Sequence, residues 1–236
     1  MHLHYLEFKF SSASDRWEAF KGIGRPAVNF ENLDQLIFGK AMGTGSGNGF
    51  SVIPSFSKYA FLVGFKSDSV NKQAVWDSKT FCQYKERAES FLHVIGKPVK
   101  SHGKWEGDNP FDVGELNFDS SRPIAVITRA TIRTRKLLEF WSNVPKTSRF
   151  MFNHPAALYQ TGIGEYPLFM QATFSIWKSR KELFEAAYSN TVHGEIVKKT
   201  RERNWYKEEL FAEFSIEHLE NSGSFYPSEL NSITQV

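Results

Sequence analysis

Residues 59–67 read YAFLVGFKS and residues 171–179 read QATFSIWKS, so two stretches of similar pattern stand 112 residues apart. Two more pairs of stretches follow the same order: residues 8–20 with 128–140 at a shift of 120, and Gly43-Thr44-Gly45 with Gly162-Ile163-Gly164 at a shift of 119. Few letters are identical between the halves. The order of the patterns therefore indicates an internal repeat of about half the chain.

Each half is expected to contain a strand, a helix, two strands joined by a turn, a second helix and a last strand. The expected strands are 3–10, 36–43, 59–66 and 97–105, then 123–132, 157–163, 169–177 and 211–217. The expected helices are 14–22 and 69–94, then 134–150 and 180–208. Ser179 and Glu182 form a capping box at the start of the last helical region, which Asn190 and Gly194 divide.

This βαββαβ order is that of the ferredoxin-like motif, whose sheet carries helices on one face only. The open face needs a partner, and two such units in one chain supply it. The predicted fold is therefore α+β, with two ferredoxin-like repeats packed as a dimeric α+β barrel, or pseudo-dimer. Its expected parts are repeats at 1–106 and 123–220, a connector at 107–122, and a flexible tail at 221–236.

Aromatic residues are the unusual part of the composition, with 22 Phe, 8 Tyr and 6 Trp in 236 residues. They indicate an aromatic core, a large apolar ligand, or both. The single cysteine, Cys82, excludes an intrachain disulfide and a CxxC zinc site. No secretory signal and no run of about 18 apolar residues is present, so a cytoplasmic location is expected.

The net charge of +3 comes from 29 basic and 26 acidic residues, so the excess of basic residues is small. The basic runs near residues 129–136 and 198–203 are typical of solvated helix faces with charges of both signs. Nucleic acid is therefore not an expected partner. Anionic groups on a ligand and a peripheral contact with an anionic membrane both remain open.

Motifs for common active sites are absent. The Gly-rich run at 42–50 lacks GxGxxG spacing, because Asn48 stands where the third glycine is needed, and no helix follows it. There is no HExxH motif among the seven histidines. His193 is notable because its counterpart at a shift of 112 is Phe81. It is either a ligand-bearing residue or an ordinary surface or capping histidine.

Four ordered blocks resemble the bacterial spheroidene monooxygenases, which oxidise carotenoids. They are residues 40–50 (KAMGTGSGNGF), residues 127–133 with Phe140-Trp141 and Val144-Pro145, residues 162–165 with 171–177, and His193 through Arg201 with Trp205-Tyr206 and residues 208–212. The resemblance covers most of the chain, roughly residues 17–215. The resemblance implies a dimeric α+β barrel that binds haem b and uses O₂ and an electron donor. It implies a monooxygenase acting on an apolar small molecule, with a carotenoid as the expected substrate.

The resemblance also assigns site residues, although it leaves the catalytic residues unknown. His193 is the expected axial ligand of the haem iron, with His154 as the second choice. Arg129 and Arg133 are expected to pair with the haem propionates, and ordinary surface salt bridges are the alternative for them.

Two alternative functions stay open. One is a haem-binding barrel with another role, such as a carrier, a dehydratase or a peroxidase-like enzyme. The other is a cofactor-free barrel for a small ligand. Pairing of open sheet edges between chains also keeps a homo-oligomer open.

Overall fold

The structure is a computed structural model that describes residues 1–25, 30–47, 51–66, 71–111, 113, 118–152, 154–188 and 199–235. The first half contains β1 (His2–Lys9), α1 (Ala13–Ile23), β2 (Leu36–Gly45), β3 (Pro54–Phe65), α3 (Lys79–Arg87) and β4 (Ser90–Gly103). The second half contains β5 (Ile124–Ile132), the 3₁₀ turn η1 (Thr134–Lys136), α4 (Leu137–Phe152), β6 (Ala157–Tyr166), β7 (Met170–Trp177), α5 (Arg180–Tyr188), β8 (Tyr206–Ser222) and η2 (Ser228–Gln235).

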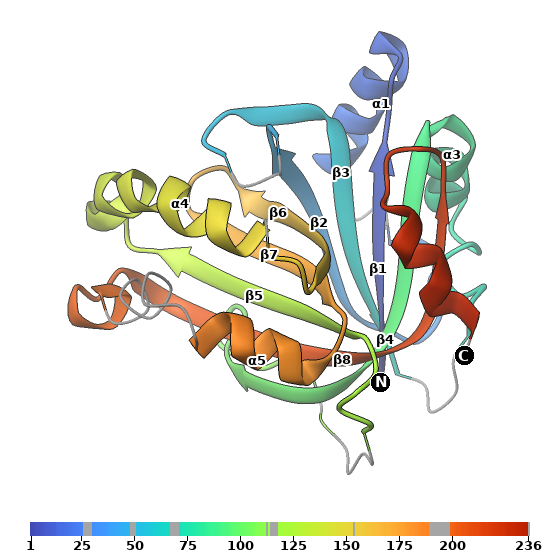
Figure 1. The fold of residues 1–236 in the computed structure, drawn as a ribbon. Helices are drawn as coiled ribbons and strands as arrows, with labels where there is room; N and C mark the ends of the chain where they lie inside the picture. Colours follow the sequence, from blue (N-terminus) through green and yellow to red (C-terminus); the bar gives the residue numbers. More distant parts are fainter. Residues whose placement is uncertain are drawn as a thin grey trace.

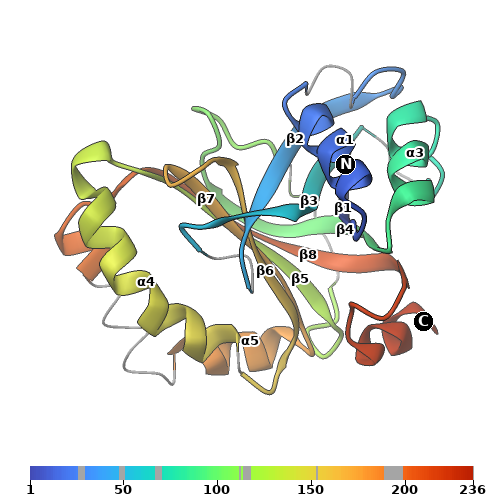
Figure 2. The ribbon, with the colours of Figure 1, turned by 90° about the horizontal axis from the view of Figure 1, so that it is seen from above.

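The strands form one closed barrel in the order β1-β3-β2-β6-β7-β5-β8-β4 (Figure 1). Each half contributes a four-stranded antiparallel sheet, β4-β1-β3-β2 and β8-β5-β7-β6, and the two sheets join at β2–β6 and β4–β8. Helices lie outside the barrel in both halves (Figure 2). The predicted α+β pseudo-dimer of two ferredoxin-like repeats is confirmed.

The hydrogen-bond register corrects one detail of the repeat. Tyr5 lies opposite Leu62, whereas Ala125, 120 residues after Tyr5, lies opposite Ile176. The third strands of the halves are therefore related by a shift of 114, not 112. The two-residue error keeps every side chain on its expected face, because the side-chain period of a strand is two.

The two glycine stretches that revealed the repeat meet each other in space. Gly43 pairs with Gly164 and Thr44 with Ile163, where β2 joins β6. Equivalent strands of the two halves thus face each other at this seam, as a pseudo-twofold axis requires.

Side chains that alternate along each strand divide the fold into an interior and an outer layer. Leu3, Tyr5, Leu62, Phe174 and Phe214 belong to the barrel's interior cluster, and each is at most 3% exposed. Tyr5 stacks on Phe174 with ring centroids 3.6 Å apart. Aromatic residues therefore fill the centre of the barrel, and this interior is a core rather than a channel.

The helix predicted at 69–94 is wrong over most of its length. Only Lys79–Arg87 forms α3, and β4 begins at Ser90. Residues 90–96 are buried on both faces of the sheet, so their pattern is a continuous apolar run. Such a run does not distinguish a strand from a buried helix.

The second long helical prediction is correct at its start and again at residues 199–202, which are helical. The capping box is confirmed, since the Glu182 N–H donates to Ser179 Oγ at 3.1 Å and Ser179 Oγ donates to the Glu182 carboxylate at 2.9 Å. Helix α5 ends at Tyr188, and β8 already begins at Tyr206. Residues 189–198, which include His193, lie outside the described residues.

The segment expected to be a flexible tail is ordered and packed. Strand β8 runs to Ser222, a turn at Gly223 (φ +81°) follows, and η2 lies along the barrel. Tyr226 and Leu230 are buried in the interior cluster. Their apolar side chains, rather than the neighbouring serines, decide where this segment lies. Within the described residues, no helix is long and apolar enough to span a membrane.

Candidate functional site

The outer faces of the two sheets carry different side chains at equivalent positions. In the first half, one cross-strand row reads Gly43, Tyr59, Phe8, Phe91 on β2, β3, β1 and β4. The matching row in the second half reads Gly162, Thr173, Thr128, Phe211 on β6, β7, β5 and β8. Two aromatic rings at the centre of the row are thus replaced by threonines.

The next row repeats the replacement. Phe61, Leu6 and His93 lie side by side in the first half, and Ser175, Val126 and Glu213 lie at the matching positions in the second. Beyond the first rows, Phe10 corresponds to Ala130 at the same shift of 120. We call Ala130, Thr128, Gly162, Thr173 and Ser175 the small-residue floor of the second sheet.

In the first half the aromatic rings of the sheet are covered. Phe8 and Phe61 have no exposed surface, and both rings contact Tyr84 of α3, with centroids 5.6 and 5.4 Å away. Phe81 of α3 packs edge-on against Phe61 at 5.1 Å. These rings form a closely packed hydrophobic core.

In the second half Thr128 is exposed, although β5 lies between β7 and β8. Apolar packing among the described residues gathers at the two ends of this face instead. One cluster contains Ile124, Trp177 and Leu183 of α5, and the other contains Ile132 and Phe140 of α4. The small-residue floor lies between these clusters.

Four aromatic rings of the first half have small residues at the matching positions of the second half, and they give a measure of the space above the floor. They are Phe8, Phe10, Tyr59 and Phe61. A buried aromatic side chain covers 150–250 Å², so four of them account for roughly 600–1,000 Å² of flat apolar contact. A wide, flat ligand fits such a place better than a compact one does. In Figure 2, α4 and α5 flank this side of the barrel.

The structure does not bring the sequence-predicted residues together as one set. His193 lies outside the described residues. Its comparison with Phe81 used the shift of 112; at 114, Phe81 matches Glu195 and His193 matches Lys79 in the sequence. His154 precedes β6, and its ring lies 5.9 Å from that of Trp177, at one end of the floor's face.

Arg129 points into the barrel, on the face opposite to the floor. Its side chain is 1% exposed and forms ion pairs with Glu208 and, at 3.6 Å, with Glu165. Its guanidinium also lies 5.1 Å from the centre of the Trp105 ring. Arg133 lies just after β5, where its Nε donates to the Tyr206 carbonyl at 3.0 Å.

A second group of polar residues, not foreseen from the sequence, lies inside the barrel around Glu7. This carboxylate has no exposed surface and accepts hydrogen bonds from the hydroxyls of Tyr5 (2.6 Å), Tyr159 and Tyr226 (3.2 Å). Lys58 Nζ lies 3.5 Å away. Burial, followed by the charge of Glu7, raises the pKa of all three tyrosines well above the usual value of 10. They remain neutral donors to this carboxylate.

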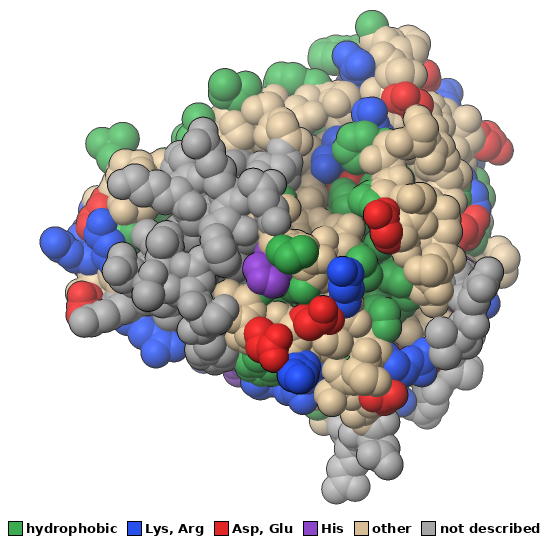
Figure 3. Space-filling model, viewed as in Figure 1, with side chains coloured by type: hydrophobic (Ala, Val, Ile, Leu, Met, Phe, Trp, Pro, Cys, Tyr) green, Lys and Arg blue, Asp and Glu red, His purple; other side chains and the backbone are tan. Residues whose placement is uncertain are grey.

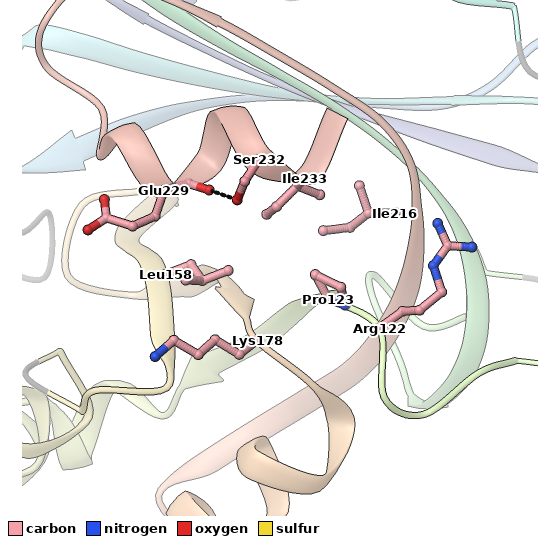
Figure 4. Close-up of a pocket in the computed structure, with 8 residues that line it drawn as sticks. All are labelled: Arg122, Pro123, Leu158, Lys178, Ile216, Glu229, Ser232 and Ile233. Carbon is pink, nitrogen blue, oxygen red and sulfur yellow. Dashed lines mark hydrogen bonds between the residues drawn. The ribbon is translucent and has the colours of Figure 1, made fainter. Parts of the chain in front are cut away.

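A cavity of about 350 Å³ separates η2 from the barrel (Figure 4). Leu158, Ile216 and Ile233 supply its apolar lining. Ser232 Oγ, on its η2 side, is engaged with the Glu229 carbonyl at 2.6 Å. The cavity presents few convergent polar groups.

The surface offers no strong field of one sign on the face shown in Figure 3, where basic and acidic side chains are interspersed. This matches the near-balance of 29 basic and 26 acidic residues.

Comparison with known proteins gives clear relatives. The chain is 33% identical over 188 residues to a spheroidene monooxygenase of Rhodobacter capsulatus, and the match covers 78% of the chain and 77% of that protein. It is 30% identical over 210 residues to a spheroidene monooxygenase of Cereibacter sphaeroides, covering 89% of the chain but 64% of that protein's length. No family model matches the chain.

Among solved structures, an aldoxime dehydratase superposes with a TM-score of 0.63 at 13% identity, covering 91% of this chain and 81% of that one. An aldoxime dehydratase in complex with butyraldoxime gives 0.58 at 14%, covering 91% and 79%. At such identities the likeness concerns the fold alone. The Rhodobacter protein is similar in sequence as well, with 33% identity over 77% of its length. The chain therefore belongs to the spheroidene monooxygenase family, a family of oxidoreductases.

Proposed function

We propose that this chain is a haem-dependent monooxygenase of an apolar polyene, with haem b bound over the small-residue floor. The observation that carries the proposal is the exposed Thr128 at the position where the first half buries Phe8. Membership of the spheroidene monooxygenase family supports the oxygenase chemistry. A carotenoid is the proposed substrate, because the relatives are named for one.

The floor suits a macrocycle for simple steric reasons. Short side chains at Thr128, Ala130 and Thr173 let a flat ring approach the sheet closely, while the apolar clusters at both ends exclude water from its edges. When bound, haem supplies the activation of O₂. The chain supplies the axial ligand, for which His193 remains the proposed residue and His154 the second choice.

Arg129 and Arg133 differ in how available their guanidinium groups are to pair with the haem propionates. Arg129 is committed to Glu165 and Glu208 on the other face of the sheet. Arg133 uses only its Nε on the Tyr206 carbonyl, so its terminal N–H groups can form a bidentate pair with a propionate. We therefore retain Arg133 and not Arg129 in this role.

Transfer of one oxygen atom to a C–H bond, with the second atom released as water, consumes two electrons and two protons. An external electron donor is thus part of the proposal. The apolar substrate would bind after haem, when haem already covers the small-residue floor.

The test is a hemin titration of the purified chain, followed by its Soret band. Thr128→Phe restores the first half's ring and is expected to weaken hemin binding about tenfold or more, which corresponds to 1.4 kcal/mol. Thr128→Val keeps the size of threonine and serves as the control. Equal hemin affinity in the Phe and Val variants would overturn the location.

The axial ligand and the reaction need separate measurements. His193→Ala is expected to shift the Soret band, and added imidazole is expected to restore it. Pigment analysis of carotenoid-producing cells that express the chain then tests the reaction. Hemin binding without any oxygenated carotenoid would favour another haem-dependent activity, and no hemin binding would favour the cofactor-free barrel.

A further inference from the structure

Four of the seven histidines gather on the outer face of the first half, away from the floor. His2 and His4 lie on β1, His93 on β4 and His218 on β8. All are buried or half-buried. Along β8, His218 is seven residues from Phe211 at the floor's edge, which is about 23 Å of extended chain. This cluster is therefore a separate place from the proposed haem site.

Three of its side chains converge. His93 lies directly opposite Glu220 across the β4–β8 pairing, and His218 is two residues before Glu220 on the same face of β8. One ligand atom from each of the three lies within 4.8 Å of the others. Ligands of a tetrahedral ion with bonds of 2.0–2.1 Å stand about 3.3 Å apart, so small side-chain rotations close the set.

The buried ring of His93 is only half engaged. Its Nε2 lies 3.0 Å from His4 Nδ1, so one of the two rings donates a proton to the other. Among the residues that the structure describes, none forms a hydrogen bond with its Nδ1, although His93 has no exposed surface. An unpaired buried nitrogen costs free energy unless another group satisfies it.

One of the two arrangements of the His4–His93 hydrogen bond leaves a free lone pair at this nitrogen. If His93 Nε2–H donates to His4, Nδ1 is left as a bare acceptor beside His218 and Glu220. A histidine whose second nitrogen is fixed by a hydrogen bond is the usual arrangement in metal sites.

The cluster is reachable from solvent. His218 and Glu220 line a hollow of about 580 Å³ whose other walls include Trp76, Cys82 and Lys85. Trp76 packs edge-on against the His93 ring at 5.2 Å and limits how far that ring can turn. An ion can thus enter from the hollow and meet a ring that is already oriented.

Lys85 is the competitor for such an ion. Its Nζ lies 3.2 Å from Glu220 and 4.4 Å from the centre of the Trp76 ring. Its side chain is 36% exposed, so it can move away into solvent. A divalent ion at Glu220 would take the place of this single positive charge.

We propose that His93, His218 and Glu220 bind a divalent first-row transition-metal ion at the outer edge of the β4–β8 seam. Two imidazoles and one carboxylate suit ions such as Zn²⁺, Co²⁺ or Fe²⁺ and leave coordination positions for water. The ion would connect the last strand of the first repeat to the last strand of the second. It would therefore raise the stability of the barrel closure.

The test uses the full chain, without a histidine tag and treated with a chelator, and Co²⁺ and Zn²⁺ as probes. Bound Co²⁺ is expected to give visible d–d absorption at one equivalent, and Zn²⁺ is expected to displace it and raise Tm. His218→Gln and Glu220→Gln change half-buried residues and should each weaken Co²⁺ binding about tenfold to a hundredfold. Lys85→Met should tighten it.

Two controls make the result decisive. His102→Gln changes a histidine near the far end of β4 and should leave Co²⁺ affinity unchanged. His193→Ala should also leave it unchanged, which separates this site from the proposed haem site. Absence of d–d absorption in the parent chain, or equal affinity in the Glu220→Gln and His102→Gln variants, would overturn the proposal.

Discussion

The outer faces of the two sheets have the same strand order and the same register, yet one buries Phe8 while the other leaves Thr128 exposed at the matching position. Phe8, Phe61 and Tyr59 make the first face continuous with Tyr84 of α3. Threonine and serine hold the matching places in the second. The comparison shows that the backbone of a repeat need not change when a few rings on one face are replaced by small side chains. If haem binds the second face as proposed, the loss of these rings is the change that makes room for it.

The strongest way to break this comparison is to exchange residues between the faces. Phe8→Thr removes a ring with no exposed surface and should cost about 3–5 kcal/mol of unfolding free energy. Thr128→Phe adds a ring at an exposed position and should change stability by less than about 1 kcal/mol. Urea unfolding of both variants gives the two values. Similar losses would mean that the second face is packed like the first.

Acidification tests a polar feature that belongs to the first face alone. The folded chain keeps His4 neutral down to about pH 3, whereas the unfolded chain protonates it below about 6.5. Stability is therefore lost as the pH falls from 6.5 towards 3. Between pH 7.5 and 5.5 the loss from His4 is about 1.4 kcal/mol, and His93 adds to it in the same direction.

The measurement is the urea midpoint of the chain at the two pH values, with His4→Gln as the matched variant. That variant should lose less stability on acidification than the parent chain, because a glutamine does not titrate. An identical loss in both would show that His4 gains no proton on unfolding.

The smallest expected effect concerns the serine N-caps, which begin one helix in each half. Ser12 Oγ accepts from the Asp15 N–H at the start of α1, and Ser179 Oγ accepts from the Glu182 N–H at the start of α5, each at 3.1 Å. Ser12→Ala and Ser179→Ala should each cost about 1 kcal/mol, measured by thermal unfolding. A much smaller cost for Ser179→Ala would show that the second half's helices are held more loosely than the first half's.

The sequence was sufficient for the topology, because the repeat orders the elements and the βαββαβ pattern has one common solution. It was insufficient for residues 90–96, where burial on both faces hides the strand's period. The sequence also did not predict the ion-pair partners of Arg129. Glu165 and Glu208 hold that side chain inside the barrel, and they are 36 and 79 residues away in the chain.

The candidate sites were harder to predict for the same reason. The small-residue floor can be recognised in the sequence only when the third strands of the two halves are aligned at a shift of 114. The shift of 112, which is two residues too small, matched Phe81 with His193 instead. The histidine cluster joins residues 89 positions apart in the case of His4 and His93. The one local signal was His218 and Glu220, two apart on a strand and so on one face.

The contact between Tyr226 and Glu7 also sets an order of events during synthesis. Strand β1 is made first, but its buried carboxylate acquires the last of its hydrogen bonds only from residue 226. Strand β8, which closes the barrel by pairing with both β4 and β5, ends just before it. The first repeat must therefore wait, with the open face of its sheet uncovered, until residue 226 has left the ribosome. A nascent chain stalled before residue 206 exposes that face and is the form that a chaperone would meet.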